Sequence, residues 1–345
     1  MKPKKPTLKQ IATQLGLSIS TVSRALRGMP EINFETRQAV ISLSKNLDYK
    51  SPSGTPSGLE TENSLVIASF IPCFDAHHVQ MLKGMNESTL NAGFTLSVIE
   101  TGDSFGREVA AIQRLLKTKV DGFLISKANE TTTADHFQNI LKLNKPLVFF
   151  DSKCADIQAP QYFIDYSKGA VLGTELLIEK GYRKICFLGA KASHSSVFSA
   201  EYGHLKALKE ANLSEYEKKI IMGDFDQNHA YEKTTELLKQ AERPDAFFAA
   251  NEEVAIGVFR AVTDLGYNIP KDIGILSYFD APFLAASAPS ISAVSVPSYE
   301  LGKQAVNALI EEIHLGINSK PKEVIFEPNL EIRESTNHQR RFFGI

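Results

Sequence analysis

A short polar segment near the N-terminus carries side chains that can read DNA bases. Arg24 can donate two parallel hydrogen bonds to a guanine edge, Ser20 is permissive, and Ile19 can contact only methyl groups. Neighbouring hydroxyl side chains can bind phosphates or cap a helix: Ser18, Thr21 and Ser23. The segment predicts that base contacts set specificity and hydroxyl contacts set register, provided that one helix presents both.

A second group of residues can bind a metal in principle. Cys73, His77 and His78 offer the thiolate and imidazole ligands that suit zinc. No fourth ligand is evident beside them, and such motifs have many false positives, so we expect no metal site.

No catalytic constellation is visible. The polar run at 193–196 contains His194 and three serines, but no spaced acid completes a triad. The glycine-rich nucleotide motifs and H-E-x-x-H are absent, which argues against a dehydrogenase, an NTPase or a metalloprotease. The three cysteines are an odd number without C-x-x-C spacing, which fits packing residues in a reducing compartment. We expect neither an enzyme nor a cofactor.

Two short helices are expected to position the DNA-reading segment. In the first, apolar residues recur at helical spacing, at Leu8, Ile11, Ala12 and Leu15. Thr7 can cap this helix and Gly16 can end it. In the second, capped by Ser18, the inward positions are Val22, Ala25 and Leu26. This is the pattern of a helix-turn-helix, although periodicity alone also fits a helix pair inside another kind of domain.

A third helix is expected from about Phe34 to Leu47. Asn33 can cap its start, and Val40, Leu43 and Leu47 can close a small core against the first two helices.

Charge is divided unevenly along the 345 residues, although the net charge is only -2. Residues 1–50 hold nine Lys or Arg and three Asp or Glu, a net of +6, so the remaining 295 residues hold a net of -8. A basic head on an acidic body indicates a polyanionic partner for the head. Residues 51–63 begin with SPSGTPSG, which predicts a flexible linker and not a helix.

Short apolar runs alternate with amphipathic segments from Ser64 to about Arg333. Examples of the runs are Leu65–Ile71, Val120–Ile125 and Ala246–Ala249, and examples of the helical segments are Val79–Ala92 and Tyr299–Leu315. The alternation predicts an α/β body with parallel sheets in two lobes and a ligand cleft between them. No apolar run is long enough to span a membrane, and the N-terminus has no apolar signal region, so we expect a cytoplasmic protein with no membrane partner.

The head resembles the helix-turn-helix of the LacI/GalR family of bacterial transcription regulators. The resemblance is carried by Thr7–Ala12, Gly16–Leu26, Thr36–Val40 and Leu47–Tyr49. It implies that Ile19, Ser20 and Arg24 read the operator. The expected DNA-binding residues are Thr7, Leu8, Ser18, Ile19, Ser20, Thr21, Ser23, Arg24, Arg27, Asn33 and Thr36. Arg27 departs from the usual Asn of the family and is expected to add a phosphate contact.

The linker also departs from the family, in which this stretch forms a hinge helix that inserts a Leu into the minor groove. Leu59 is the only candidate here, and it stands between Gly58 and the acidic Glu60 and Glu62. We therefore expect no ordinary hinge helix and weaker bending of the DNA.

The body resembles the periplasmic-binding-protein-like core of the same family. The resemblance is carried by Val120–Ile125, Gly181–Leu188, Pro244–Gly257, Tyr299–Gly302 and Ile332–Ser335. It implies an N-terminal helix-turn-helix domain at 1–50 and a type I, two-lobed core at 64–335. The N-lobe would comprise about 64–162 and 293–326, the C-lobe about 163–290 and 327–335, and 336–345 would be a tail. It also implies a homodimer on a pseudo-palindromic operator.

The effector pocket is where the sequence departs most from sugar-binding members of the family. Ala200, Phe279 and Val296 replace an Arg, an Asp and a Gln that such members carry. The polar residues left for the cleft are Asp75, His77, His78, Asp151, Asn251 and Asp280. We expect either an effector with fewer hydroxyls than a monosaccharide, or a cleft filled by Phe279 and Val296 that has lost its ligand.

These observations predict a DNA-binding regulator, most simply a repressor, modulated by a small molecule. A solute-binding or sensing protein with the same two-lobed core is the alternative, and the basic head argues against it.

Overall fold

The computed structural model describes residues 6–26, 32–47, 49, 65–189, 195–213, 220–223, 226–317 and 321–337. The chain divides into a head unit, Met1–Leu65, and a body unit, Val66–Ile345. The expected linker at 51–63 and most of the expected tail lie outside the described residues. No helix among the described residues is long and apolar enough to cross a membrane.

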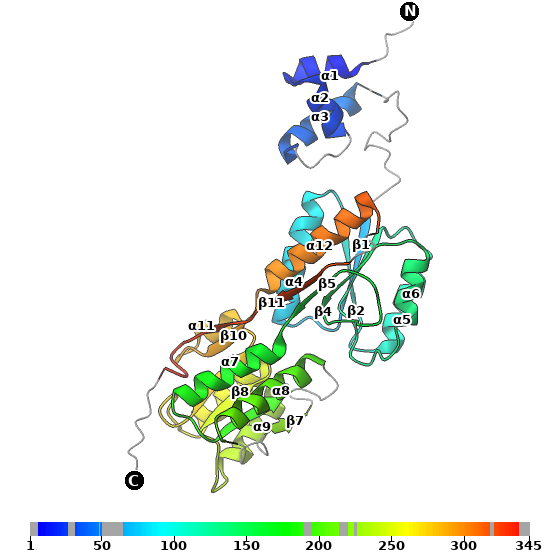
Figure 1. Cartoon of the computed structure of the whole chain (residues 1–345). Coiled ribbons are helices and arrows are strands. Elements are labelled where there is room, and N and C mark those ends of the chain that lie inside the picture. The colour runs from blue at the N-terminus through cyan, green and yellow to red at the C-terminus, as the bar shows by residue number, and fades with distance from the viewer. Residues whose placement is uncertain are drawn as a thin grey trace, which may run out of the picture. The chain divides into compact units, whose positions relative to one another are not determined.

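The head contains the three expected helices: α1 (Leu8–Leu15), α2 (Ile19–Leu26) and α3 (Phe34–Asn46) (Figure 1). Its core is small and consists of Ile11, Ala12, Val22, Ala25, Val40 and Tyr49. Leu8, Leu15, Leu26, Leu43 and Leu47 pack at its margin. The periodic apolar positions therefore do face one another, as the sequence predicts.

The first lobe of the body is built on a six-stranded parallel sheet in the order β11-β5-β4-β3-β1-β2. Its strands are β1 (Val66–Ile71), β2 (Thr95–Glu100), β3 (Gly122–Ile125), β4 (Leu147–Asp151), β5 (Gln161–Ile164) and β11 (Glu323–Phe326). Its helices are α4 (Ala76–Asn91), α5 (Phe105–Leu115), α6 (Asp135–Lys142) and α12 (Ser298–Leu315).

The second lobe has another six-stranded sheet, in the order β12-β10-β9-β8-β6-β7, parallel except for β12. Its strands are β6 (Ile185–Gly189), β7 (Ile220–Met222), β8 (Ala246–Ala249), β9 (Gly274–Tyr278), β10 (Ser292–Ser295) and β12 (Asn329–Glu331). Its helices are α7 (Tyr166–Glu179), α8 (Ser195–Glu210), α9 (Gln227–Leu238), α10 (Glu252–Asp264) and α11 (Pro282–Ala286).

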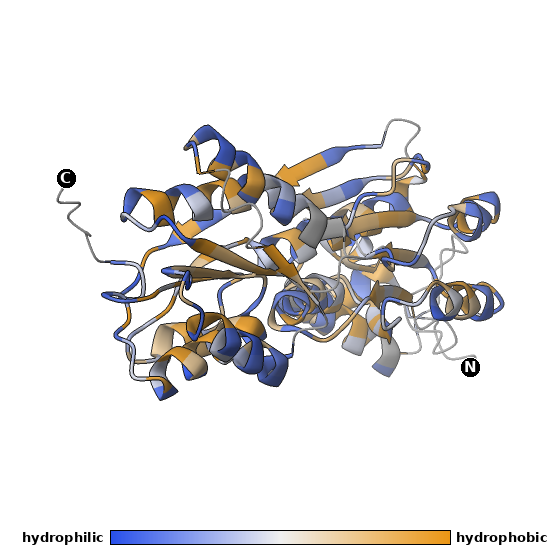
Figure 2. Ribbon diagram, turned by 90° about the horizontal axis from the view of Figure 1, so that it is seen from below, coloured by the Kyte–Doolittle hydropathy of each residue, from blue (hydrophilic) through white to orange (hydrophobic). Residues whose placement is uncertain are grey.

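Burial explains why these strands form where they do. Every residue of β3, β6, β8 and β9 is buried, as expected of central parallel strands covered by helices on both faces. Figure 2 shows hydrophobic residues concentrated in the strands and in the helix faces beside them. The edge strand β2 has no fully buried residue.

The chain passes between the lobes three times: at Asp165 after β5, at Val296–Pro297 after β10, and at Glu327–Pro328 after β11. The first two crossings differ from the expected boundaries at 162 and 293, because β5 extends to Ile164 and β10 extends to Ser295. Both strands are only four residues long, and their ends carry no turn signal in the sequence.

Two helices of the first lobe, α4 and α12, cross at a pair of glycines. A Cβ atom at Gly84 would lie 2.0 Å from the Tyr299 carbonyl oxygen, and one at Gly302 would lie 2.1 Å from the Met81 carbonyl oxygen. Only glycine permits this approach of the two backbones. The contact fixes the first turn of α12 against α4, and both of these helices carry residues of the site described next.

Candidate functional site

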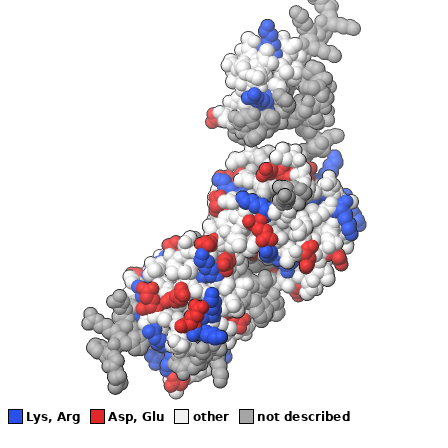
Figure 3. Space-filling view, in the orientation of Figure 1, with Lys and Arg blue, Asp and Glu red and all other residues white. Residues whose placement is uncertain are grey.

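The head presents its predicted DNA-reading residues on the outer side of α2. Val22 and Ala25 are buried, whereas Ser20 and Arg24 are exposed and Ile19 is 48% exposed. A large apolar side chain that remains half exposed is available for contact with a partner. In Figure 3, the described part of the head shows basic side chains, with acidic atoms at its edge, among mostly uncharged ones, whereas basic and acidic side chains are intermixed over the body.

Several of the predicted DNA-binding residues have structural roles at helix ends. Thr7 forms a capping box with Gln10: Thr7 N–H donates to Gln10 Oε1 at 2.9 Å, and Gln10 N–H donates to Thr7 Oγ1 at 3.3 Å. Gly16 ends α1 with φ 65°. The Ser18 hydroxyl accepts from Thr21 N–H at 3.0 Å and so caps α2.

The third helix begins in the same way. Asn33 Oδ1 accepts from Thr36 N–H at 2.8 Å.

Two further predicted DNA-binding residues are not among those described on the exposed face of α2. Leu8 packs at the margin of the head core. Arg27 lies outside the described residues.

In the body, the predicted effector residues gather around His77, at the start of α4. His77 is buried, with Nδ1 hydrogen-bonded to Ser298 Oγ at 2.7 Å and Nε2 at 3.0 Å from Asp151 Oδ1. The Phe279 ring, from the second lobe, stacks on the His77 ring with centroids 4.5 Å apart and planes 25° apart. These contacts join the two lobes through one imidazole.

Asp151, the last residue of β4, is the acidic centre of this cluster. Its side chain is 11% exposed, its φ is 64°, and it accepts hydrogen bonds from Tyr166 and, at 3.4 Å, from Ser126. Burial opposes its ionisation, but hydrogen bonds and charge from His77 and His78 outweigh burial and hold the pKa of Asp151 well below its usual range. Burial and the adjacent Asp151 raise the pKa of Tyr166 well above 10.

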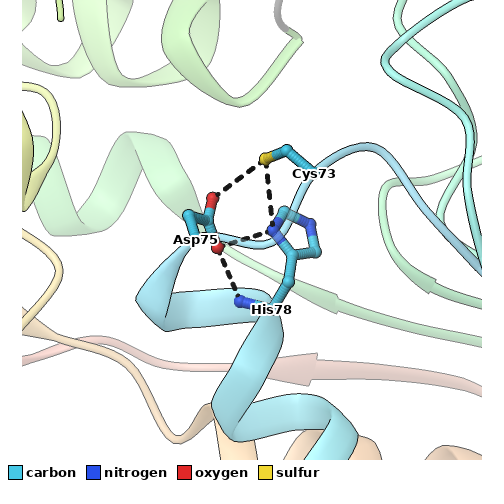
Figure 4. A group of neighbouring side chains, drawn as sticks. All are labelled: Cys73, Asp75 and His78. Carbon is cyan, nitrogen blue, oxygen red and sulfur yellow. Dashed lines mark hydrogen bonds and ion pairs between the residues drawn. The ribbon is translucent and has the colours of Figure 1, made fainter.

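A second cluster lies beside the first, in the loop between β1 and α4, and is drawn in Figure 4. Asp75 caps α4: its Oδ1 accepts from His78 N–H and pairs with His78 Nδ1, both at 2.7 Å. Cys73 Sγ lies 3.4 Å from Asp75 Oδ2 and 3.9 Å from His78 Nδ1. The other ring nitrogen, His78 Nε2, lies 3.5 Å from Asp151 Oδ2, which connects the two clusters.

Within this second cluster, the Asp75 carboxylate and the His78 imidazole each stabilise the charged form of the other. Burial disfavours the charged forms, but the His78 partner lowers the pKa of Asp75 to about 2. Likewise, burial is outweighed by Asp151 and Asp75, which raise the pKa of His78 well above 6.5. Burial raises the pKa of the Cys73 thiol.

Two cavities adjoin the His77–Asp151–Tyr166 cluster, one on each side. The first, about 330 Å³, is lined by His77, Phe279, Asp280 and Val296, among others. The second, about 320 Å³, is lined by residues that include Asp151, Lys153, Tyr166 and Ser199. Each is at the small end of the range for ligand pockets, about 300–1,000 Å³. The contact of His77 with Asp151 therefore joins the lining of the first cavity to that of the second.

Other predicted effector residues have polar partners or are buried elsewhere. Asp280 forms a two-pronged ion pair with Arg333, with both N···O distances 2.7 Å. Asn251 caps α10 by accepting from Val254 N–H at 2.9 Å. Ala200 is buried in α8, one turn before Gly203, where the backbones of α8 and α7 come close.

Sequence reasoning missed three residues of the site: Tyr166, Ser298 and Glu252. Tyr166 begins the helix after β5, a strand too short to be recognised, and Ser298 opens α12 just after a crossing. Glu252 belongs to the second lobe, yet its Oε1 accepts from Ala76 N–H of the first lobe at 3.1 Å. The sequence could have flagged Glu252 only as one of two acids in the first turn of α10.

Comparisons with known proteins agree with both units. Residues 7–52 match the model of the "Bacterial regulatory proteins, lacI family", and residues 174–336 match that of a "Periplasmic binding protein-like domain". Catabolite control protein A of Priestia megaterium is 24% identical over 333 residues, which is 96% of this chain and 99% of that protein. The ribose operon repressor of Haemophilus influenzae is 28% identical over 334 residues, 95% of this chain and 98% of that protein.

Among solved structures, the fold is similar to that of a transcriptional regulator CelR–cellobiose complex. The TM-score is 0.70 at 23% identity, with 96% of this chain and 99% of that chain covered.

Proposed function

Because the chain belongs to the LacI family of bacterial transcriptional regulators, we propose that it represses transcription as a homodimer on a pseudo-palindromic operator. In this proposal its body senses a ligand that is not an ordinary monosaccharide. The observation that carries the proposal is a helix-turn-helix head with an outward-facing Ile19, Ser20 and Arg24, joined in one chain to a two-lobed body with cavities between the lobes.

The head supports sequence-specific recognition. Caps at Thr7, Ser18 and Asn33 fix the helices, so the exposed side chains of α2 are held by a rigid element. Arg24 then supplies the guanine contact, while the capping hydroxyls and nearby N–H groups are placed to meet phosphates. A homodimer follows from operator geometry, since two heads related by a two-fold axis read two half-sites.

The cleft supports an effector other than an ordinary monosaccharide. A sugar needs free donors and acceptors, whereas Asp280 is bound to Arg333, Asn251 is bound to its own helix, and the face of His77 is covered by Phe279. A hydroxyl that displaced one of these partners would leave a partly buried polar group unsatisfied, at a cost of up to about 1–3 kcal/mol. Effector binding acts on DNA affinity only through its different affinity for the two states of the body.

Selection of randomised duplex DNA by the purified full-length chain tests the proposal. An enriched pseudo-palindrome, together with a dimer mass in sedimentation, supports it. Retention at low salt without any motif contradicts sequence-specific recognition, because phosphate contacts alone give that result.

Calorimetry tests the effector class separately. We expect neither ribose nor cellobiose to bind, and we expect the double variant Ala200→Arg, Phe279→Asp to gain no ribose binding. Micromolar binding of ribose to the wild-type chain contradicts the proposed effector class, and ribose binding by the double variant alone shows that these two positions are what excludes the sugar.

A further inference from the structure

The cluster of Cys73, Asp75 and His78 has the donor set of a transition-metal site. The thiol sulfur, a carboxylate oxygen and an imidazole nitrogen all lie within 4.8 Å of one another at the start of α4 (Figure 4). Thiolate, imidazole and carboxylate together are ligands typical of zinc. From the sequence, Cys73, His77 and His78 are the candidate ligands, but the structure directs His77 to Ser298 and Asp151 and puts Asp75 in its place.

The separations of the donors are close to those around a shared cation. Donor atoms around one tetrahedral zinc lie about 3.3–3.6 Å apart, given Zn–S and Zn–N bonds of about 2.3 and 2.0 Å. Cys73 Sγ lies 3.4 Å from Asp75 Oδ2 and 3.9 Å from His78 Nδ1. To admit the ion, the 2.7 Å separation of His78 Nδ1 and Asp75 Oδ1 must widen, and the 3.9 Å separation of Cys73 Sγ and His78 Nδ1 must shorten slightly.

A second observation concerns the far side of the histidine ring. With Nδ1 on a metal, Nε2 carries the proton and faces Asp151 Oδ2 at 3.5 Å. A carboxylate behind a ligating histidine is the usual support in metal sites, where it fixes the tautomer and orients the ring. Asp151 is itself held by His77 and Tyr166.

A third observation concerns a carboxylate of the opposite lobe that lies beside the cluster. Glu252 is 9% exposed and binds Ala76 N–H, next to Asp75, through Oε1. Its second oxygen, Oε2, is buried and has no hydrogen-bond partner among the described residues.

We infer that Cys73, Asp75 and His78 bind one divalent cation of the zinc type, and that Glu252 completes the site from the second lobe. The cation then ties the start of α4 to the start of α10 and favours the closed arrangement of the lobes. This inference deepens the proposed function, on which its regulatory part rests, by giving the effector a chemical class.

The binding test uses the full-length chain, stripped of metals and kept reduced without thiol reagents, and titrated with Co²⁺. We expect one equivalent to bind with a thiolate-to-cobalt charge-transfer band, and Zn²⁺ to displace it. Cys73→Ala should abolish the band, and Cys73→His should restore binding without it. Absence of the band in the wild-type chain, or its persistence in Cys73→Ala, overturns the inference.

Matched controls separate this site from adventitious binding. Cys154→Ala removes a buried thiol elsewhere, and His229→Asn removes an exposed histidine; both should leave the titration unchanged. Loss of the band in Cys154→Ala contradicts the assignment to Cys73. Glu252→Gln keeps the side-chain shape and removes the charge, so it should weaken Zn²⁺ binding at least about tenfold, the lower end of the loss seen even for groups outside the ligand shell. An unchanged affinity overturns the cross-lobe role of Glu252.

The regulatory part is tested on the selected DNA, with and without Zn²⁺. We expect Zn²⁺ to change the DNA affinity of the wild-type chain and not that of Cys73→Ala. Equal affinities overturn the role of the cation as effector, whereas failure to select any DNA counts against the proposed function and leaves the Co²⁺ result standing.

Discussion

At the scale of single residues, Arg24 is the side chain on which operator recognition depends most directly. It is exposed in the last turn of α2, and its planar fork matches the two acceptors of guanine. We expect Arg24→Ala to cost about 1–3 kcal/mol of operator binding and to relax the preference at one base pair per half-site. Arg24→Lys keeps the charge but not the planar fork. It should relax the preference at the same base pair, but it should reduce the affinity for unrelated DNA less than Arg24→Ala does. A selection profile identical to that of the wild type contradicts the role.

A buried histidine in the second lobe makes a residue-scale prediction about pH. His204 is fully buried, its ring packs on Phe187 and Phe248, and burial lowers its pKa to about 3. In the unfolded chain His204 is protonated below about pH 6.5, whereas in the folded chain it stays neutral down to about pH 3. His204 therefore lowers the free energy of unfolding as the pH falls from about 6.5 towards 3. The slope is about 1.4 kcal/mol per pH unit.

His204→Phe tests this prediction, because it keeps the ring contacts and removes the titrating group. Denaturant unfolding at a series of pH values should show a shallower loss of stability in acid than in the wild type. His229→Asn, at a histidine that is 64% exposed, is the control and should leave the slope as it is. A wild-type slope in His204→Phe shows that other groups cause the acid sensitivity.

The same scale shows what the sequence could and could not predict about the site. His77, Asp151 and Phe279 were expected in the cleft, and they do meet there. The other residues of the site, Tyr166, Ser298 and Glu252, come from elements that start at lobe crossings or in the other lobe. Such neighbours depend on how two sheets face each other, which no local pattern encodes.

At the scale of elements, the crossing of α4 and α12 is the contact most sensitive to a small change. We expect Gly302→Ala to destabilise the body by about 1–3 kcal/mol, because the added methyl meets the Met81 carbonyl at 2.1 Å and the backbones must separate. Urea unfolding measures the loss.

Gly106→Ala is the matched control, since an added Cβ in α5 finds only Ser104 Oγ, at 3.9 Å. It should be neutral or stabilising by up to about 1 kcal/mol, because alanine favours a helix over glycine. If Gly302→Ala and Gly106→Ala change the free energy of unfolding equally, the close approach of α4 and α12 is not the cause of the destabilisation.

Element boundaries also show where sequence patterns are strong. The continuous apolar runs at β1, β3 and β8 were predicted nearly to their ends, because strands covered on both faces need apolar residues at every position. β5, β10, β11 and β12 contain polar residues and β7 has only three residues, so no long apolar run marks any of them. Their place in the sheets is set by pairing with distant strands.

At the scale of the whole molecule, the division of charge predicts how DNA binding responds to salt. The net of +6 in residues 1–50 assigns phosphate contacts to the head, and the acidic remainder cannot share them. We expect Lys9→Gln to weaken binding to operator and unrelated duplex alike and to reduce the log–log salt slope by about 1 per head. Lys209→Gln, which removes an exposed charge of the body, should change neither the DNA affinity nor the salt slope. If both substitutions have the same effect, the head is not the part that contacts the phosphates.

The three crossings between the lobes limit how the body can move. The register pairs Ile164 with Phe326 and Ser295 with Asn329, so the crossing segments leave neighbouring strands and must bend together. A single connecting segment would allow one lobe to twist, slide and tilt independently against the other. Three connecting segments restrict the relative motion of the lobes to nearly one direction. Any occupant of the cleft, organic molecule or cation, therefore acts on the same coordinate. Two ligands that bind together would therefore reinforce or oppose each other in this one motion, and only their combined effect on the lobe arrangement could influence the head.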